Sequence, residues 1–146
     1  MRRMQRTAHI SATPAEVYAF VSDPANVRDW QTGVISSERT SPPPTVTGST
    51  GRVVFEVMGQ RITADTTVRE AVPDQRLVLA TSVSGMSVLG TLDLAPDEGG
   101  TRLTFSSEIK AESIFMAPLE RMVADAAEKD LDASLARLKA TIEKPG

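Results

Sequence analysis

Three hydroxyl side chains, Thr66, Thr81 and Ser107, are the polar groups that the sequence places on the apolar face of a predicted β-sheet. In the segments around them apolar and polar residues alternate, as they do in antiparallel strands with one buried face. Gly90 lies on the same face and leaves room beside them. Hydroxyls in an apolar pocket can orient the polar end of a ligand, or they can bond to backbone groups or a buried water.

Groups that could transfer protons are scarce on that face. General acid–base catalysis needs a titratable side chain near the substrate, and none points inward from these predicted strands. The one histidine, His9, points outward by alternation with Ala8 and Ile10, which argues against a Ser-His-Asp triad. Asp130 shares a side of the C-terminal helix with apolar residues, so it is the one candidate catalytic acid; alternatively, it lies at the edge of the stripe and reaches water.

Composition excludes several other kinds of site. The chain has 146 residues, no cysteine and one histidine, so thiolate and His-rich metal sites are excluded. No Walker or dinucleotide motif is present, and we expect no metal and no cofactor. The net charge of −3 argues against nucleic acid or an anionic membrane as a partner.

No apolar run approaches the roughly 20 residues of a membrane span. The basic start, MRRMQRTAHI, is not followed by the apolar region of a secretory signal. We therefore expect a cytoplasmic protein.

Two short helices should follow the first strand. Thr13-Pro14-Ala15-Glu16 matches a capping box with proline at the first helical position. Asp23-Pro24 repeats the signal and predicts a second helix from about Pro24 to Arg28. Trp30, the only tryptophan, comes directly afterwards; it could line a pocket entrance or be a half-buried anchor between helix and sheet.

The middle of the chain predicts consecutive β-hairpins, with turns at Gly59-Gln60, Gly85-Met86 and Asp97–Gly100. These turns pair Val57 with Ile62, Val83 with Val88, and Leu94 with Leu103. Each register gathers apolar residues, Phe55 and Phe105 among them, on one face. The Pro- and Ser-rich segment from Ser37 to Gly51 is interpreted as a long loop.

The last segment predicts one helix from Ala117 to Glu143. Its apolar stripe changes side midway, which indicates different surroundings for its two halves. The first half carries Leu119, Met122, Val123 and Ala126, and the second carries Ala127, Leu131, Leu135, Leu138 and Ile142. A pliable lid around a ligand could be formed by Met86, Phe115, Met116 and Met122, or each could be ordinary core.

The stretch ISATPAEVYAFVSDPANVRDW, residues 10–30, and the closing LDASLARLKATIE resemble the START-like (SRPBCC) superfamily, especially its polyketide cyclase/dehydrase and lipid-transport branch. The resemblance implies one α+β domain over residues 1–146 with the helix-grip fold. In that fold a curved antiparallel sheet of about seven strands wraps the long helix, with two short helices between strands 1 and 2. It further implies a deep apolar cavity that the first half of the helix covers and the second half seals, with Trp30 near the entrance.

The leading hypothesis is binding or transport of a hydrophobic small molecule, such as a lipid, polyketide or aromatic metabolite, in that cavity. The candidate ligand contacts are Trp30, Phe55, Thr66, Thr81, Gly90, Phe105, Ser107, Phe115, Leu119, Met122, Val123 and Ala126. One alternative is a polyketide cyclase or dehydratase that uses Asp130. Another is a protein-interaction module, or a homodimer, with an exposed apolar patch on the outer face of the sheet. That patch would consist of Val54, Met58, Val78 and Leu89.

Overall fold

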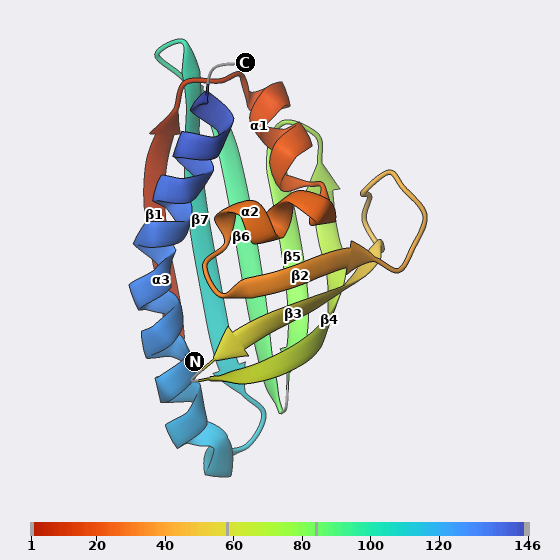
Figure 1. Cartoon of the computed structure of the whole chain (residues 1–146), viewed down its shortest axis with the longest axis vertical. Coiled ribbons are helices and arrows are strands. Elements are labelled where there is room, and N and C mark those ends of the chain that lie inside the picture. Colours follow the sequence, from red (N-terminus) through yellow and green to blue (C-terminus); the bar gives the residue numbers. More distant parts are fainter. Residues whose placement is uncertain (1, 58, 84, 145–146) are drawn as a thin grey trace.

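A curved antiparallel sheet and a long C-terminal helix form the computed structural model, which describes residues 2–57, 59–83 and 85–144 (Figure 1). The strands are β1 (Arg2–Ile10), β2 (Val34–Arg39), β3 (Thr50–Val57), β4 (Gln60–Val72), β5 (Arg76–Val83), β6 (Met86–Asp97) and β7 (Gly100–Ala111). The helices are α1 (Pro14–Val21), the 3-10 turn η1 (Pro24–Asn26), α2 (Val27–Trp30), the 3-10 turn η2 (Ile114–Met116) and α3 (Ala117–Glu143).

The strand order is β1-β7-β6-β5-β4-β3-β2. In Figure 1, β2, β3 and β4 sweep across the direction of β6 and β7, while α3 runs along the β1 side of the sheet. The helix-grip fold expected from the sequence is confirmed. No helix among the described residues combines the length and the apolar character that crossing a membrane requires.

The capping signals at the start of the chain are confirmed. The Thr13 hydroxyl accepts a hydrogen bond from the Glu16 N–H at 3.2 Å and donates one to the Glu16 carboxylate at 3.0 Å. The Asp23 carboxylate accepts from the Ala25 N–H at 3.0 Å and begins η1. The second predicted helix is therefore split into a 3-10 turn and the short α2, which continues to Trp30.

The β6–β7 register is confirmed, with Leu94 opposite Leu103. The two preceding registers are each wrong by two residues, because the pairs closest to the turns are Val57 with Gln60 and Val83 with Met86. Gly59 and Gly85, with φ of 79° and 80°, directly precede the returning strands, so each two-residue turn lies one residue earlier than predicted. A shift of two residues preserves the alternation, so the predicted face still points inward.

The loop predicted from Ser37 to Gly51 is shorter than expected. Strand β2 continues to Arg39, and β3 begins at Thr50. Arg39 pairs with Gly51 across the two strands. A segment rich in Pro and Ser can still supply edge-strand residues where the neighbouring backbone offers hydrogen bonds.

The main core lies where α1, α2 and the second half of α3 cover the sheet. It consists of Ile10, Ala12, Val17, Tyr18, Val21, Trp30, Val68, Leu77, Leu92, Leu94, Leu103, Leu135 and Leu138. Trp30 is 1% exposed and meets the Phe105 ring edge-on, with centroids 5.8 Å apart. Of the two sequence interpretations, its position matches an anchor, although the side chain is fully rather than half buried.

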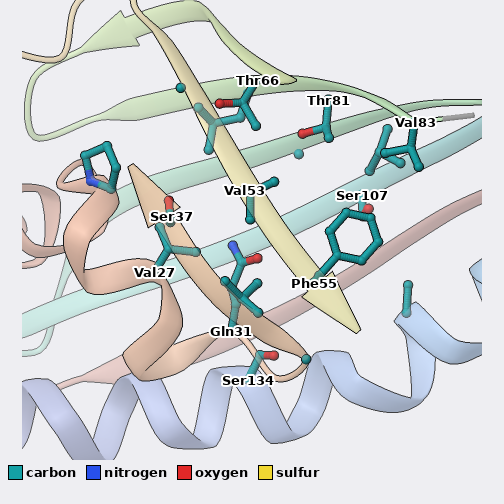
Figure 2. A pocket seen from close by; sticks show the side chains of 18 of the residues that line it. Val27, Gln31, Ser37, Val53, Phe55, Thr66, Thr81, Val83, Ser107 and Ser134 are labelled. Atoms are coloured by element: carbon teal, nitrogen blue, oxygen red, sulfur yellow. The ribbon is translucent and has the colours of Figure 1, made fainter. Parts of the chain in front are cut away.

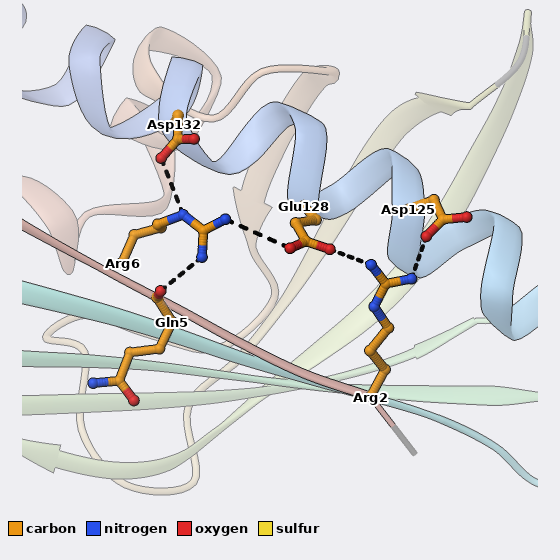
Figure 3. A network of polar contacts seen from close by, with 6 residues as sticks. All are labelled: Arg2, Gln5, Arg6, Asp125, Glu128 and Asp132. Atoms are coloured by element: carbon orange, nitrogen blue, oxygen red, sulfur yellow. Dashed lines mark hydrogen bonds and ion pairs between the residues drawn. The ribbon is translucent and has the colours of Figure 1, made fainter.

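A network of charges joins α3 to the edge strand β1 (Figure 3). Arg2 contacts both Asp125 and Glu128, and these hydrogen bonds raise the pKa of Arg2. Arg6 lies 3.5 Å from Glu128 and 3.2 Å from Asp132. These ion pairs connect the first half of α3 to β1.

Candidate functional site

A cavity of about 430 Å³ lies between the concave face of the sheet, the α2–β2 segment and α3. Its volume falls within the range of about 300–1,000 Å³ that is typical of small-molecule sites. Figure 2 shows side chains from several strands and from α3 converging on it, from Thr66 and Thr81 on the sheet to Gln31 and Ser134 near the helix. Most of the sheet wall is aliphatic or aromatic, and it includes Val53, Phe55, Ile62, Leu79, Val83, Val88 and Phe105.

The three hydroxyls predicted to face inward all lie on the wall of this cavity. Thr66 and Thr81 are direct partners on β4 and β5, and Ser107 lies opposite Gly90 on β6 and β7. None of the three side-chain hydroxyls has a hydrogen-bond partner within the described part of the chain. A hydroxyl facing an apolar space without a partner is available to a ligand or to bound water.

Helix α3 contributes Val123, Ala126, Ala127 and Asp130 to the wall. Small side chains keep the helix backbone near the cavity without filling it, whereas Leu138 further along is buried in the core. The predicted division of the helix is met only in part, because Ala127 and Leu131 of the second stripe also line the cavity. The Asp130 carboxylate is half-buried on the wall, so the candidate acid is within reach of the cavity.

Four of the predicted ligand contacts do not lie on the cavity wall. Trp30 is in the core behind Phe105. Phe115 is 91% exposed on η2. Leu119 and Met122 are exposed as well. Val123 is the first α3 residue of the cavity wall, and Leu119 lies one helical turn before it. Met122 points about 100° away from Val123 around the helix axis. Helical periodicity identifies a side of a helix, but it does not say how far the cavity extends beneath that side.

Sequence reasoning missed several polar groups of the wall, namely Gln31, Ser37, Arg39, Glu56 and Ser134. Arg39 is the most consequential, since it is the one basic residue among the described residues that line the cavity. Alternation within VISSER could have found Ser37 and Arg39, had that segment been interpreted as a strand. Ser134 also ties the helix to the α2–β2 segment, because its hydroxyl accepts from the Thr32 N–H at 2.9 Å.

The remaining sequence candidates lie elsewhere. His9 is half-buried beside the β6–β7 turn, with its Nε2 3.0 Å from the Asp97 carbonyl oxygen. Within the described residues no group of three or more His, Asp or Glu side chains could hold a metal ion. On the outer face Val78 is buried, Val54 and Leu89 are half-buried, and Met58 lies outside the described residues. The described members therefore do not form the exposed patch that the interaction hypothesis requires.

Comparisons with known structures agree with the fold. The aromatase/cyclase ZhuI from Streptomyces sp. R1128 superposes with a TM-score of 0.81 at 13% identity, over 98% of this chain and 94% of that one. Protein TTHA0849 from Thermus thermophilus gives 0.79 at 19% identity, over 97% of both chains. The di-domain aromatase/cyclase BexL gives 0.77 at 19% identity, over 99% of this chain and 51% of that one.

At these identities the structural likeness shows the fold alone. No curated protein matches the chain. Residues 1–143 match the family described as polyketide cyclase/dehydrase and lipid transport. The match spans nearly the whole sequence, so this chain belongs to the polyketide cyclase/dehydrase and lipid transport family.

Proposed function

We propose that this protein binds a hydrophobic small molecule, a lipid, polyketide or aromatic metabolite, in the cavity beneath α3. One observation carries the proposal: an apolar cavity of about 430 Å³ whose sheet wall presents the unpartnered hydroxyls of Thr66, Thr81 and Ser107. Removing apolar ligand surface from water contributes about 25 cal/mol per Å². The hydroxyls then set the orientation of the ligand rather than most of the affinity.

Filling the cavity tests this proposal. Ala126 lies on the wall at the inner side of α3, whereas Ala133 is exposed on the same helix. We expect Ala126→Trp to weaken binding of an apolar fluorescent dye at least tenfold, and Ala133→Trp to bind as the wild type does. Equal dye affinity in both variants would place the dye outside the cavity and contradict the proposal.

Native mass spectrometry of the purified protein addresses the natural ligand. Mass carried by the wild type and lost in Ala126→Trp would be released by extraction and identified. The same measurement reports whether the chain forms the homodimer that the sequence left open.

A second candidate function is catalysis of cyclisation or dehydration, and the position of Asp130 on the wall favours it. The structural neighbours include proteins named as aromatase/cyclases, and a carboxylate is a suitable general acid or base. Asp130→Asn keeps the shape of the side chain and removes its proton-transfer capacity. Turnover of a bound polyketide by the wild type but not by Asp130→Asn, with equal ligand affinity, would support the enzyme over the carrier.

A further inference from the structure

The Arg39 side chain is a cation on the cavity wall without an acidic partner. Its Nη1 donates a hydrogen bond to the Thr45 hydroxyl at 2.6 Å. No carboxylate within the described part of the chain pairs with it, although Arg52, on the neighbouring strand, pairs with Asp65 at 3.4 Å. Arg39 is half-buried, so its charge has lost part of its hydration without an anion to compensate for the loss.

The loop between β2 and β3 fixes the orientation of this guanidinium. The Thr45 hydroxyl that accepts from Arg39 itself donates to the Ser22 carbonyl oxygen at 2.8 Å. A guanidinium carries five N–H donors, so this single bond anchors one corner and leaves the others available. The free edge formed by Nε and Nη2 has the spacing that two carboxylate oxygens match.

Arg39 begins a polar row that crosses four strands. Arg39 pairs with Gly51, Gly51 with Thr66, and Thr66 with Thr81. A Cβ atom at Gly51 would lie 2.9 Å from the Thr66 Oγ1. The Thr66 hydroxyl is therefore close to the Gly51 Cα and is directed from β4 toward β2. The absence of a side chain at Gly51 thus brings a hydroxyl donor toward the strand that carries the cation.

Beyond this row the sheet wall is mostly apolar, with Ser107 as a further hydroxyl, and no acidic residue belongs to the row itself. Val53, Phe55 and Val83 follow on the sheet, while Glu56 lies at an exposed position of β3 and Asp130 is on α3. A cation and hydroxyls at one end of an apolar space complement a molecule with an anionic head and an apolar body.

We propose that the row Arg39–Gly51–Thr66–Thr81 is a carboxylate site, and that the ligand is an amphiphile whose carboxylate pairs with Arg39 and whose apolar body lies along Val53, Phe55 and Val83. This assignment rests on the proposed function. With about 30 Å³ for each water-sized group in a liquid, the cavity of about 430 Å³ holds roughly 14 non-hydrogen atoms. Decanoate, which has twelve, is a suitable probe.

Calorimetric titration with decanoate and with the neutral decanol tests the site. A charge-assisted hydrogen bond corresponds to about tenfold in affinity at a partly exposed position. Arg39→Met keeps the aliphatic stem and removes the charge, so it should weaken decanoate about tenfold and change decanol less than about twofold. Thr66→Val should weaken decanoate by a smaller factor, and Arg52→Met, on the outer face, should change neither affinity.

The outcomes separate this site from the cavity itself. Equal decanoate affinity in the wild type, Arg39→Met and Thr66→Val would overturn the carboxylate site while leaving apolar binding intact. Equal losses of decanoate and decanol in Arg39→Met would also overturn it, because the change would then act on the cavity rather than on the head group. A wild type that binds neither probe would overturn the proposed function. Thermal unfolding of each variant confirms that the comparisons are made between folded proteins.

Discussion

Two leucines on α3 should differ in packing cost, because only one of them borders the cavity. Leu131 is 5% exposed and lies on the cavity wall, where it contacts a small cluster with Met4, Ile109 and Ala124. Leu138, two turns later, is 0% exposed and is surrounded by the main core. Both are helical leucines of one element, so truncating each to alanine compares the two environments directly.

The expected costs follow from what each truncation leaves behind. Leu→Ala removes three methyl-sized groups, worth about 2.4 kcal/mol at about 0.8 kcal/mol each. At Leu138 the new void is enclosed, and the lost contacts raise the total to about 4 kcal/mol, within the usual range for buried leucines. At Leu131 the removed atoms already face an open space on one side, so the total should remain near about 2.5 kcal/mol.

Urea denaturation of the ligand-free variants, with unchanged m-values, measures both costs. Equal costs at the two positions, or a greater cost at Leu131, would refute the conclusion that α3 spans a hollow at residue 131. Decanol affinity supplies a second readout, since Leu131→Ala enlarges the cavity and should alter it, whereas Leu138→Ala should not.

Three further changes test the local structure. Thr13→Ala removes the cap of α1 and should cost about 1 kcal/mol by urea denaturation, and an unchanged stability would contradict that role. Burial raises the pKa of the Tyr18 phenol, and the charge of Asp74 raises it further. The buried hydroxyl has no hydrogen-bond partner within the described residues, so Tyr18→Phe should leave the free energy of unfolding unchanged or increase it. A loss above about 1 kcal/mol would reveal a partner for the hydroxyl. The hydrogen bond from Lys139 holds the pKa of the Glu143 carboxylate below its usual range. The ionised carboxylate therefore stabilises the fold at pH values above its unfolded-state pKa of about 4.3. This contribution to stability is lost as the pH falls through the lower pKa of the folded state. Glu143→Gln should therefore flatten the acid side of the stability profile, and a profile identical to that of the wild type would contradict the assignment.

Local signals in the sequence predicted the elements well. The Thr13 and Asp23 caps lie where the helices begin. Helix α3 has the predicted bounds, with Pro118 in its first turn and the sequence Pro145-Gly146 after its last. Hairpin pairing was less secure. A glycine can occupy either central position of a two-residue turn, so Gly59 and Gly85 are compatible with two strand registers that differ by two residues. A shift of two residues leaves the same side chains on the inward face.

The candidate site was predicted only in part, since a cavity wall is made by contacts distant in sequence. Alternation placed Thr66, Thr81 and Ser107 correctly on the wall. Arg39 was missed because loop-like composition concealed the end of β2. Phe115 was included because it is large and apolar, and nothing in its neighbours indicated that η2 extends into solvent. The ion pairs of Arg2 and Arg6 with α3 likewise depend on which helix covers β1.

The central claim is that an apolar ligand enters the space between the sheet and α3. Methyl-detected NMR with decanol tests it most directly, because one titration reports on valine methyl groups of both sheet faces. We expect the largest shifts at the inward methyl groups of Val53, Val83 and Val123, with little change at Val54 and Val78 on the outer face. Shifts confined to the outer face, or no saturable shifts at the inward valines, would contradict the account.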